Sequence, residues 1–384
     1  MVQHVLLTGA TGLVGHYLLR DLLSTGVPVA AVIRARNGES AADRLERVLT
    51  RLAGASGRQL PRPVCLEGDV TEPGLGLSAG DRRWAARHCG AVIHNAASLQ
   101  FHGQDRGRDP WLSNLTGTAH TLELCRELRL RELHYVSTAY VCGRREEVVF
   151  EADLDRGQAF TNAYEECKFQ AEKLVRSADF LDGLTVYRPA VIVGDSRTGF
   201  TTTYHGLYAY FQFVWLASPG WPIGPDGRRL TSIRLNLTGA ETRNLVPVDW
   251  VSDVISHVVR HPRHHGTTYH LTPTDPVRAS ELAGAMATYF NVHGHEFAGR
   301  DAFVAEAMTA EEQLFYSFLE RYQPYWESEP TFDCTNTLAA APHLPCPRLD
   351  APMLHRLLDF AIEDRWGKGR PKRPARARSI QRVG

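Results

Sequence analysis

The sequence contains little cysteine and methionine, with seven and four in 384 residues, and it has no excess charge of either sign. The cysteines lie far apart and form no Cys-x-x-Cys pair, which excludes a disulfide framework and a cysteine-based zinc motif and suits a reducing compartment. Lys and Arg number 43, as do Asp and Glu. No overall field therefore favours nucleic acid or a membrane surface.

Long apolar runs and a signal peptide are also missing. The longest apolar run, 207–216, contains Tyr208, Tyr210 and Gln212 and is too short and polar to cross a bilayer. It predicts either a core helix or the lining of a site for an acyl or aromatic substrate. The N-terminus leads directly into a strand-like segment without a basic region or cleavage site, so we expect a cytoplasmic protein with no transmembrane segment.

A glycine-rich turn lies between an apolar strand at 5–7 and a helix-like segment at 16–23. Gly9 permits a tight turn, Gly12 lets the backbone approach a pyrophosphate, and Gly15 lets the helix pack closely on the strand. The helix N-terminus adds free N–H groups and a positive dipole. The turn predicts a nucleotide site formed by Thr8, Gly9, Thr11, Gly12, Leu13, Val14 and Gly15.

The ends of the following strands favour NADP over NAD. The second strand, 27–33, ends at Arg34, with Arg36 two residues on, where an NAD site usually carries an acid. Arginine suits a 2′-phosphate. Asp69, followed by Val70, ends the next strand and can accept from the adenine amino group. The strand 91–97 ends in small residues that can lie flat under a cofactor, namely Asn95, Ala96 and Ala97.

Strands and helices alternate along the first part of the chain. Further strands are expected at 64–70, 133–138 and 185–193, and helices at 111–130 and 162–177. This alternation predicts an α/β fold with a Rossmann-type doubly wound parallel sheet and a smaller, mostly helical C-terminal substrate domain. Ligands of such sheets bind outside the carboxyl ends of the strands, so the strand-end residues should converge, namely Gly9, Arg34, Asp69, Ala97 and Thr138.

Tyr164 and Lys168 lie four residues apart and share one face of the helix expected at 162–177. A nearby ammonium favours the phenolate, so we expect the pKa of Tyr164 to be lowered enough for proton transfer near neutral pH. A Tyr and a Lys at this spacing often occur by chance, so the pair indicates a catalytic site only together with the nucleotide site.

These residues, in this order, resemble the extended short-chain dehydrogenase/reductase superfamily. The resemblance rests on Thr8–Gly15, Asp69-Val70, Asn95-Ala96-Ala97, Asn114, Ser137-Thr138, Tyr164-x-x-x-Lys168 and 187–194, and it covers residues 1 to about 275. Within the superfamily, the segments 92–97, 136–141 and 194–200 are most similar to the fatty acyl reductases and the carrier-protein thioester reductase domains.

The resemblance implies a role for each site residue. Tyr164 is the acid that protonates the oxygen after hydride transfer, and Lys168 lowers its pKa and binds the nicotinamide ribose. Strand alternation turns only one of Ser137 and Thr138 inward, and the family pattern selects Thr138 as a second donor to the carbonyl. Asn114 either holds a proton-relay water or bonds a backbone carbonyl. The nicotinamide is expected to pack against Pro189 and Val191.

The resemblance implies an NADPH-dependent reductase of an acyl thioester, carried by an acyl-carrier protein or coenzyme A, with an aldehyde or alcohol product. A ketone or aldehyde reductase, or a hydroxysteroid-type alcohol dehydrogenase, is the alternative. A non-enzymatic NADP-binding regulator is a third interpretation. A sugar-nucleotide dehydratase or epimerase fits less well, because Ala139-Tyr140 follows Thr138 and Arg34 disfavours NAD.

We expect an NADP-binding domain at 1–200 with 245–275 returning to it, and a substrate-binding region at 201–244 and 276–366. A basic, disordered tail is expected at 367–384, where it solubilises the protein or attracts an acidic carrier protein. A monomer and a homodimer are both compatible with the sequence. No metal site is expected, because His264 and His265 lie in a loop without a nearby carboxylate or cysteine at ligand spacing.

Overall fold

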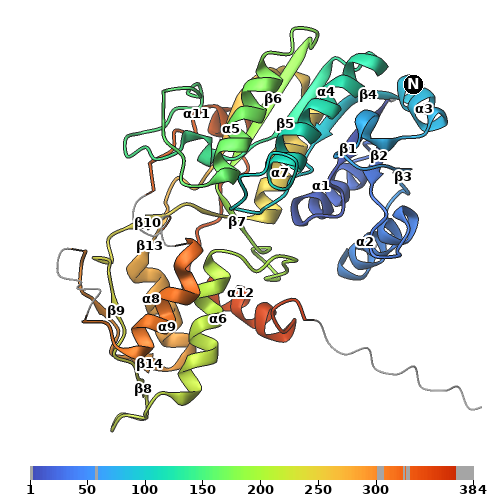
Figure 1. The fold of residues 1–384 in the computed structure, drawn as a ribbon. Coiled ribbons are helices and arrows are strands. Elements are labelled where there is room, and N and C mark those ends of the chain that lie inside the picture. The colour runs from blue at the N-terminus through green and yellow to red at the C-terminus, as the bar shows by residue number, and fades with distance from the viewer. Residues whose placement is uncertain (1–2, 57–58, 301–306, 323–324, 326–328, 369–384) are drawn as a thin grey trace, which may run out of the picture.

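The computed structural model describes residues 3–56, 59–300, 307–322, 325 and 329–368, and a seven-stranded parallel sheet forms its centre (Figure 1). The strand order is β12-β6-β5-β4-β1-β2-β3. The chain moves outward from β1 in one direction and then from β4 in the other, which confirms the predicted doubly wound Rossmann-type sheet. The strands are β1 (His4–Thr8), β2 (Val29–Ile33), β3 (Val64–Glu67), β4 (Cys89–His94), β5 (Glu132–Val136), β6 (Gly183–Pro189) and β12 (Thr268–Leu271).

Alternating residues of the central strands pack into two separate apolar layers. Leu7 belongs to a buried cluster shared with α1, α2 and α7, whereas Leu6 belongs to a cluster shared with α3, α4 and α5. The period of two follows from the pleat of a strand, and a parallel sheet covered on both faces requires both sets to be apolar. These helices are α1 (Leu13–Ser24), α2 (Ala41–Ser56), α3 (Ala79–His88), α4 (Gly117–Leu128), α5 (Ala163–Arg176) and α7 (Val248–Arg260).

The segment predicted to return to the nucleotide-binding half supplies α7 and β12. The helix α7 packs on α1, where the Ser252 hydroxyl donates to Asp21 at 2.6 Å, and β12 pairs with β6. The short helix α11 (Thr335–Ala340) also packs against β12, and the Trp250 indole donates to the carbonyl oxygen of Leu344. Part of the stretch 276–366, predicted as substrate-binding, therefore lies against the nucleotide-binding half.

A second apolar core lies below the carboxyl ends of the strands, where α6, α8 and α9 gather (Figure 1). Its helices are α6 (Leu207–Ala217), α8 (Ala279–Phe290), α9 (Ala310–Leu319) and α12 (Ala351–Glu363). Short strand pairs surround them: β7 (Val191–Val193) with β11 (Leu245–Pro247), β10 (Thr242–Arg243) with β13 (Val277–Arg278), β8 (Arg229–Leu230) with β14 (Val292–His293), and β9 (Arg234–Leu235) with β15 (Glu296–Phe297).

The strand predicted at 185–193 is divided in two. The strand β6 ends at Pro189, and β7 begins at Val191 and pairs with β11 outside the main sheet. Proline has no N–H to donate to a ladder, which favours the end of a strand at this point. The break turns the chain toward the substrate-binding region.

Within the described residues, none of the helices has the length and apolar character needed to span a bilayer. The apolar run at 207–216 instead forms α6, in which Phe211 is completely buried. Most of the predicted basic tail, residues 369–384, lies outside the described residues.

Candidate active site

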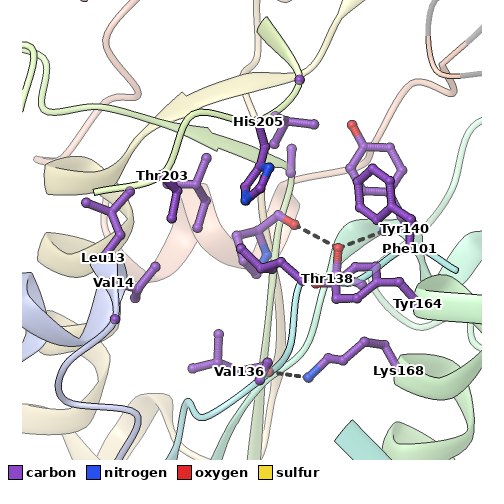
Figure 2. A pocket seen from close by; sticks show the side chains of 18 of the residues that line it. Leu13, Val14, Phe101, Val136, Thr138, Tyr140, Tyr164, Lys168, Thr203 and His205 are labelled. Carbon is purple, nitrogen blue, oxygen red and sulfur yellow. Dashed lines mark hydrogen bonds between the residues drawn. The ribbon is translucent and has the colours of Figure 1, made fainter. Parts of the chain in front are cut away.

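A cavity of about 580 Å³ opens at the carboxyl ends of the sheet strands. It extends from the glycine turn, past the ends of β2 to β5, to α5 and α6. Figure 2 shows side chains from both halves of the molecule pointing into it. The five strand-end residues expected to converge all line it, namely Gly9, Arg34, Asp69, Ala97 and Thr138.

The glycine turn leaves no room for side chains at two positions. A Cβ atom on Gly9 would lie 2.7 Å from the amide nitrogen of Ala96, and one on Gly15 would lie 2.0 Å from the carbonyl oxygen of Gly9. Gly12 precedes the first residue of α1 and has no side chain to cap it. The first N–H groups of α1, beside Leu13 and Val14 at the cavity wall, therefore face a site suited to a pyrophosphate.

Thr8 and Gly15 lie behind the cavity wall rather than on it. The Thr8 hydroxyl accepts hydrogen bonds from the amides of Asn95 and Ala96, at 3.2 and 3.1 Å. These bonds fix the end of β4 beside the glycine turn. The remaining residues predicted to contact the cofactor line the cavity, namely Thr11, Arg36, Val70, Asn95, Ala96, Pro189 and Val191.

Three arginines surround the end of the cavity beside β2. Arg34 and Arg36 were predicted there, and Arg44 joins them from the first turn of α2. Arg44 donates to the Thr11 hydroxyl at 3.1 Å and to the carbonyl oxygen of Arg34. Desolvation, reinforced by the charges of Arg34 and Arg47, lowers the pKa of Arg44. Such a cluster of positive charges suits an anionic ligand, in addition to the Asp69 carboxylate that pairs with Arg34.

Asp69 closes the same end of the cavity with a fixed carboxylate. It accepts from the Thr71 amide at 3.0 Å and from Arg34 at 3.3 Å. Desolvation opposes its charge, but these hydrogen bonds outweigh that effect and hold its pKa below the usual value.

Ser137 and Thr138 have different partners. The Ser137 hydroxyl donates to Glu172 at 2.6 Å, and this buried carboxylate also binds Arg188 at 2.6 Å. The Thr138 hydroxyl donates to the carbonyl oxygen of Pro189 and accepts from the Tyr140 amide, both at a long 3.4 Å. Figure 2 shows these two bonds beside the Tyr164 ring. The Thr138 hydroxyl is thus the one available to a ligand in the cavity.

Tyr164 and Lys168 both line the cavity, but Lys168 is directed below the phenol (Figure 2). Its ammonium donates to the Val136 carbonyl at 2.8 Å and to the Tyr135 hydroxyl at 2.9 Å. Burial lowers the pKa of Lys168 to about 8. Burial also raises the pKa of Tyr164 well above its usual value, with only the Thr138 hydroxyl acting against it. The expected lowering of the Tyr164 pKa by Lys168 is therefore wrong for this structure, because the ammonium has other partners and desolvation dominates.

Asn114 lies in a short π-helical turn, Leu112–Thr116, directly before α4. Its amide accepts from the Ser98 N–H at 2.7 Å and donates to the Ser98 carbonyl at 3.0 Å. Of the two interpretations of this residue, backbone bonding matches these contacts. Asn114 fixes the loop that follows β4 and does not itself line the cavity.

The far wall of the cavity comes from segments after residue 200. Tyr208 and Tyr210 of α6 lie there with further apolar side chains, Leu207, Leu235, Leu237 and Phe297. A polar group closes the wall near Tyr164, where the Tyr325 hydroxyl donates to Glu165 at 2.6 Å. Sequence reasoning did not identify Arg44, Tyr325 or Glu329 as lining residues. Of these three residues, only Arg44 could have been suggested by the sequence, because it follows soon after the second strand.

Comparison with known proteins gives both a family and close folds. A family model described as male sterility protein, an NAD-binding domain, matches residues 7–255. The nonribosomal peptide synthetase asaC of Aspergillus flavus is 27% identical over 72% of this chain. The L-2-aminoadipate reductase large subunit of Penicillium chrysogenum is 28% identical over 75%. The chain spans only 27% and 21% of the lengths of these two relatives.

A solved structure covers nearly the whole chain. The terminal R domain from the myxalamid PKS-NRPS biosynthetic pathway matches 96% of this chain and 93% of its own, with a TM-score of 0.76 and 26% identity. The likeness therefore includes the helical region after residue 200 as well as the sheet.

Proposed function

This chain belongs to the family described as male sterility protein, within the extended short-chain dehydrogenase/reductase superfamily, and we propose that it is an NADPH-dependent reductase of an acyl thioester. One observation carries the proposal. A single cavity joins the glycine turn, the Thr138, Tyr164 and Lys168 side chains, and an apolar wall from α6. A nicotinamide, a reacting carbonyl and an acyl chain have room to lie in that order.

The residues present fit a nicotinamide dinucleotide, and the arginines support NADPH. Gly9 and Gly15 leave no room for Cβ atoms, which keeps the turn tight, and Gly12 presents its backbone to the cavity where a pyrophosphate would approach. Arg34, Arg36 and Arg44 offer guanidinium groups for a 2′-phosphate, and no carboxylate ends β2. NADPH supplies a hydride when bound.

The chain's own residues act on the carbonyl oxygen. The raised pKa of Tyr164 keeps its hydroxyl protonated, so it can donate to the oxygen that gains negative charge. The Thr138 hydroxyl offers a second donor, and its existing bonds at 3.4 Å are weak enough to exchange. Lys168, with a pKa of about 8, adds a positive charge beneath the site near neutral pH.

For a thioester, hydride addition followed by proton transfer gives a hemithioacetal. Its C–S bond then breaks, a thiol leaves, and an aldehyde remains. The net change consumes one acyl thioester, one NADPH and one proton. A second hydride from fresh NADPH would convert the aldehyde to an alcohol.

The relatives support a carrier-bound substrate, because two are a nonribosomal peptide synthetase and an aminoadipate reductase, and the matched structure is a terminal domain of such a pathway. The acyl group would lie against Tyr208, Tyr210 and Leu207 of α6. Acyl-carrier protein and acyl-coenzyme A are both candidate donors.

The test follows NADPH absorbance with a panel of acyl-carrier and acyl-coenzyme A thioesters beside a panel of ketones and aldehydes. We expect oxidation of NADPH with thioesters. Consumption with ketones alone would assign the chain to the carbonyl reductases, and NADPH binding without turnover on any substrate would favour a regulator.

The variant Tyr164→Phe removes only the proton donor from this reaction. It should lose most of the turnover while binding NADPH as the unaltered protein does, since the phenyl ring keeps its packing on Phe101. A fully active variant would contradict the assignment of Tyr164.

A further inference from the structure

Three polar side chains meet near the amino ends of the sheet strands, at the end of the sheet opposite the cavity. Glu132 is the first residue of β5, His134 lies two residues further on the same face, and His265 lies in the turn between Pro262–His264 and β12. The cavity lies at the carboxyl ends of the strands and this group at their amino ends. The group is therefore separate from the proposed reductase site.

We propose that Glu132, His134 and His265 form a binding site for a divalent metal ion of the zinc class. Glu132 Oε1 lies 3.3 Å from His265 Nδ1 and 3.8 Å from His134 Nε2, and all three donor atoms lie within 4.8 Å of one another. Two ligands bound about 2.0–2.1 Å from a tetrahedral zinc ion lie about 3.4 Å apart. Small side-chain movements would complete the coordination, leaving a fourth position for water.

Two of the donor atoms are buried without a hydrogen-bond partner. His134 is completely buried, and among the described residues neither its Nε2 nor Glu132 Oε1 makes a well-oriented hydrogen bond, although Oε1 lies 3.3 Å from His265 Nδ1. Leaving buried polar atoms unsatisfied is unfavourable, and each such atom in a folded protein needs an explanation. A cation between them would satisfy both.

Neighbouring groups orient the ligands as a metal site requires. His265 Nε2 donates to the carbonyl oxygens of Val258 and Val259, at 3.1 and 3.3 Å, so Nδ1 is the ring nitrogen that faces Glu132. His134 Nδ1 is hydrogen-bonded to the Tyr187 hydroxyl at 2.9 Å. Metal-bound histidines commonly have such partners on the other ring nitrogen.

A close contact and the exposure of two ligands fit the same site. The Glu132 carboxylate packs over Gly183, where a Cβ atom would lie 2.1 Å from Oε2. Glu132 and His265 keep some solvent exposure, which gives an ion a path of entry.

A metal at this position would be structural. Within the described sheet β12 is an edge strand paired with β6 alone, and β6 lies between β12 and β5. The ion would connect the turn before β12 to the start of β5, two strands away. It would thereby fix two segments about 130 residues apart in the chain, and closing a long loop stabilises the folded state.

The experiment uses the untagged full chain, stripped of metal with a chelator and titrated with Zn²⁺ or Co²⁺. We expect about one equivalent bound per chain, a visible absorption band of tetrahedral cobalt, and a rise in melting temperature with zinc. Glu132→Gln and His265→Gln, checked for folding by circular dichroism, should each weaken zinc binding by about tenfold or more and abolish the rise.

His264→Gln is the matched control, because it removes an adjacent histidine that contributes no donor atom to the group. It should bind zinc as the unaltered chain does. Absence of the cobalt band, or equal zinc binding by all variants, would overturn the proposal and leave an ion pair between His265 and Glu132. Thioester reduction is assayed separately with and without zinc, so a failed reductase assay does not decide the metal site.

Discussion

The charge of Lys168 depends directly on the fold. This residue is 2% exposed, and its ammonium lies 4.4 Å from the centre of the Tyr135 ring while donating to the Val136 carbonyl. Desolvation favours the neutral amine and brings its pKa down to about 8, although Cys167 and Glu172 act in the opposite direction. Its charge therefore changes within the pH range of an ordinary assay.

A pH profile tests the role of this charge. Lys168 is protonated below about pH 8 and neutral above it, so we expect kcat/KM for reduction to fall as the pH rises through that value. Lys168→Arg keeps a permanent cation and should move the falling limb to higher pH, whatever its maximal rate. Lys173→Arg, which alters an exposed residue of α5 paired with Asp155, should leave the limb in place. An unchanged limb in Lys168→Arg would exclude Lys168 as its cause.

Arg44 provides a separate test of cofactor choice. If it binds a 2′-phosphate, Arg44→Ala should raise the KM for NADPH by about 10- to 100-fold, since a charge-assisted hydrogen bond contributes about 1.5–3 kcal/mol. The KM for NADH should change little. Arg47→Ala is the control, because Arg47 pairs with Glu39 at 2.9 Å and does not line the cavity. Equal losses for NADPH and NADH would contradict a 2′-phosphate contact.

Residues at strand ends could be predicted because a parallel sheet brings its carboxyl ends together whatever surrounds them. Gly9, Arg34 and Thr138 follow from that rule. The position of Arg44 does not follow from that rule, because the direction of its side chain depends on how α2 packs on the sheet. The pKa of Tyr164 could not be predicted from the sequence either. Phe101 and Tyr325 come from distant segments of the chain and contribute to the burial of the phenol.

At the scale of elements, the turn between β1 and α1 is a tightly constrained junction. The Gly12 amide donates to the Gly9 carbonyl at 3.0 Å, and α1 begins one residue later. Gly15 lies directly above that carbonyl. Any side chain there must push α1 away from β1, and the first turn of α1 would then lose its position relative to the cavity.

Gly15→Ala should therefore lower the stability of the protein and abolish NADPH binding. Its Cβ atom would lie 2.0 Å from Gly9 O and 2.8 Å from Ala10 Cα, and both neighbours are backbone that cannot rotate away. Gly284→Ala in α8 is the matched control, because nothing lies within 4 Å of its Cβ position and alanine favours a helix by about 1 kcal/mol. Thermal unfolding with and without NADPH measures both effects. NADPH binding at normal affinity by Gly15→Ala would refute the close packing of the turn.

Elements that depend on local pattern were predicted well, and those that depend on distant partners were not. The amphipathic helix at 162–177 corresponds to α5, whose first residue follows the Asn162 cap. The division of 185–193 depends on pairing with β11, which comes later in the chain, and the position of α11 depends on packing against β12, which comes much earlier. The proposed metal ligands combine Glu132 with His265, and no local spacing could have indicated that pair.

At the scale of the whole molecule, the nucleotide-binding half is assembled from separate stretches of chain. The helix α7 follows α6 and the short strands in sequence, yet its buried face packs on α1 and the sheet. Val251, Val254 and Ile255 are completely buried in that contact. The cofactor site thus depends on residues that the chain reaches only after it has left the sheet and returned.

Ile255→Ala tests this dependence without touching the cavity. Deleting a fully buried Ile side chain costs about 2–5 kcal/mol, so we expect the free energy of unfolding to fall by that amount in denaturant titrations. Arg260→Ala on the exposed end of α7 should change it by less than about 0.5 kcal/mol. The folded Ile255→Ala protein should keep its affinity for NADPH, and NADPH should still raise its melting temperature, because the glycine turn is intact. A loss confined to the substrate-binding region, with the sheet unfolding as before, would show that α7 does not support the nucleotide-binding half.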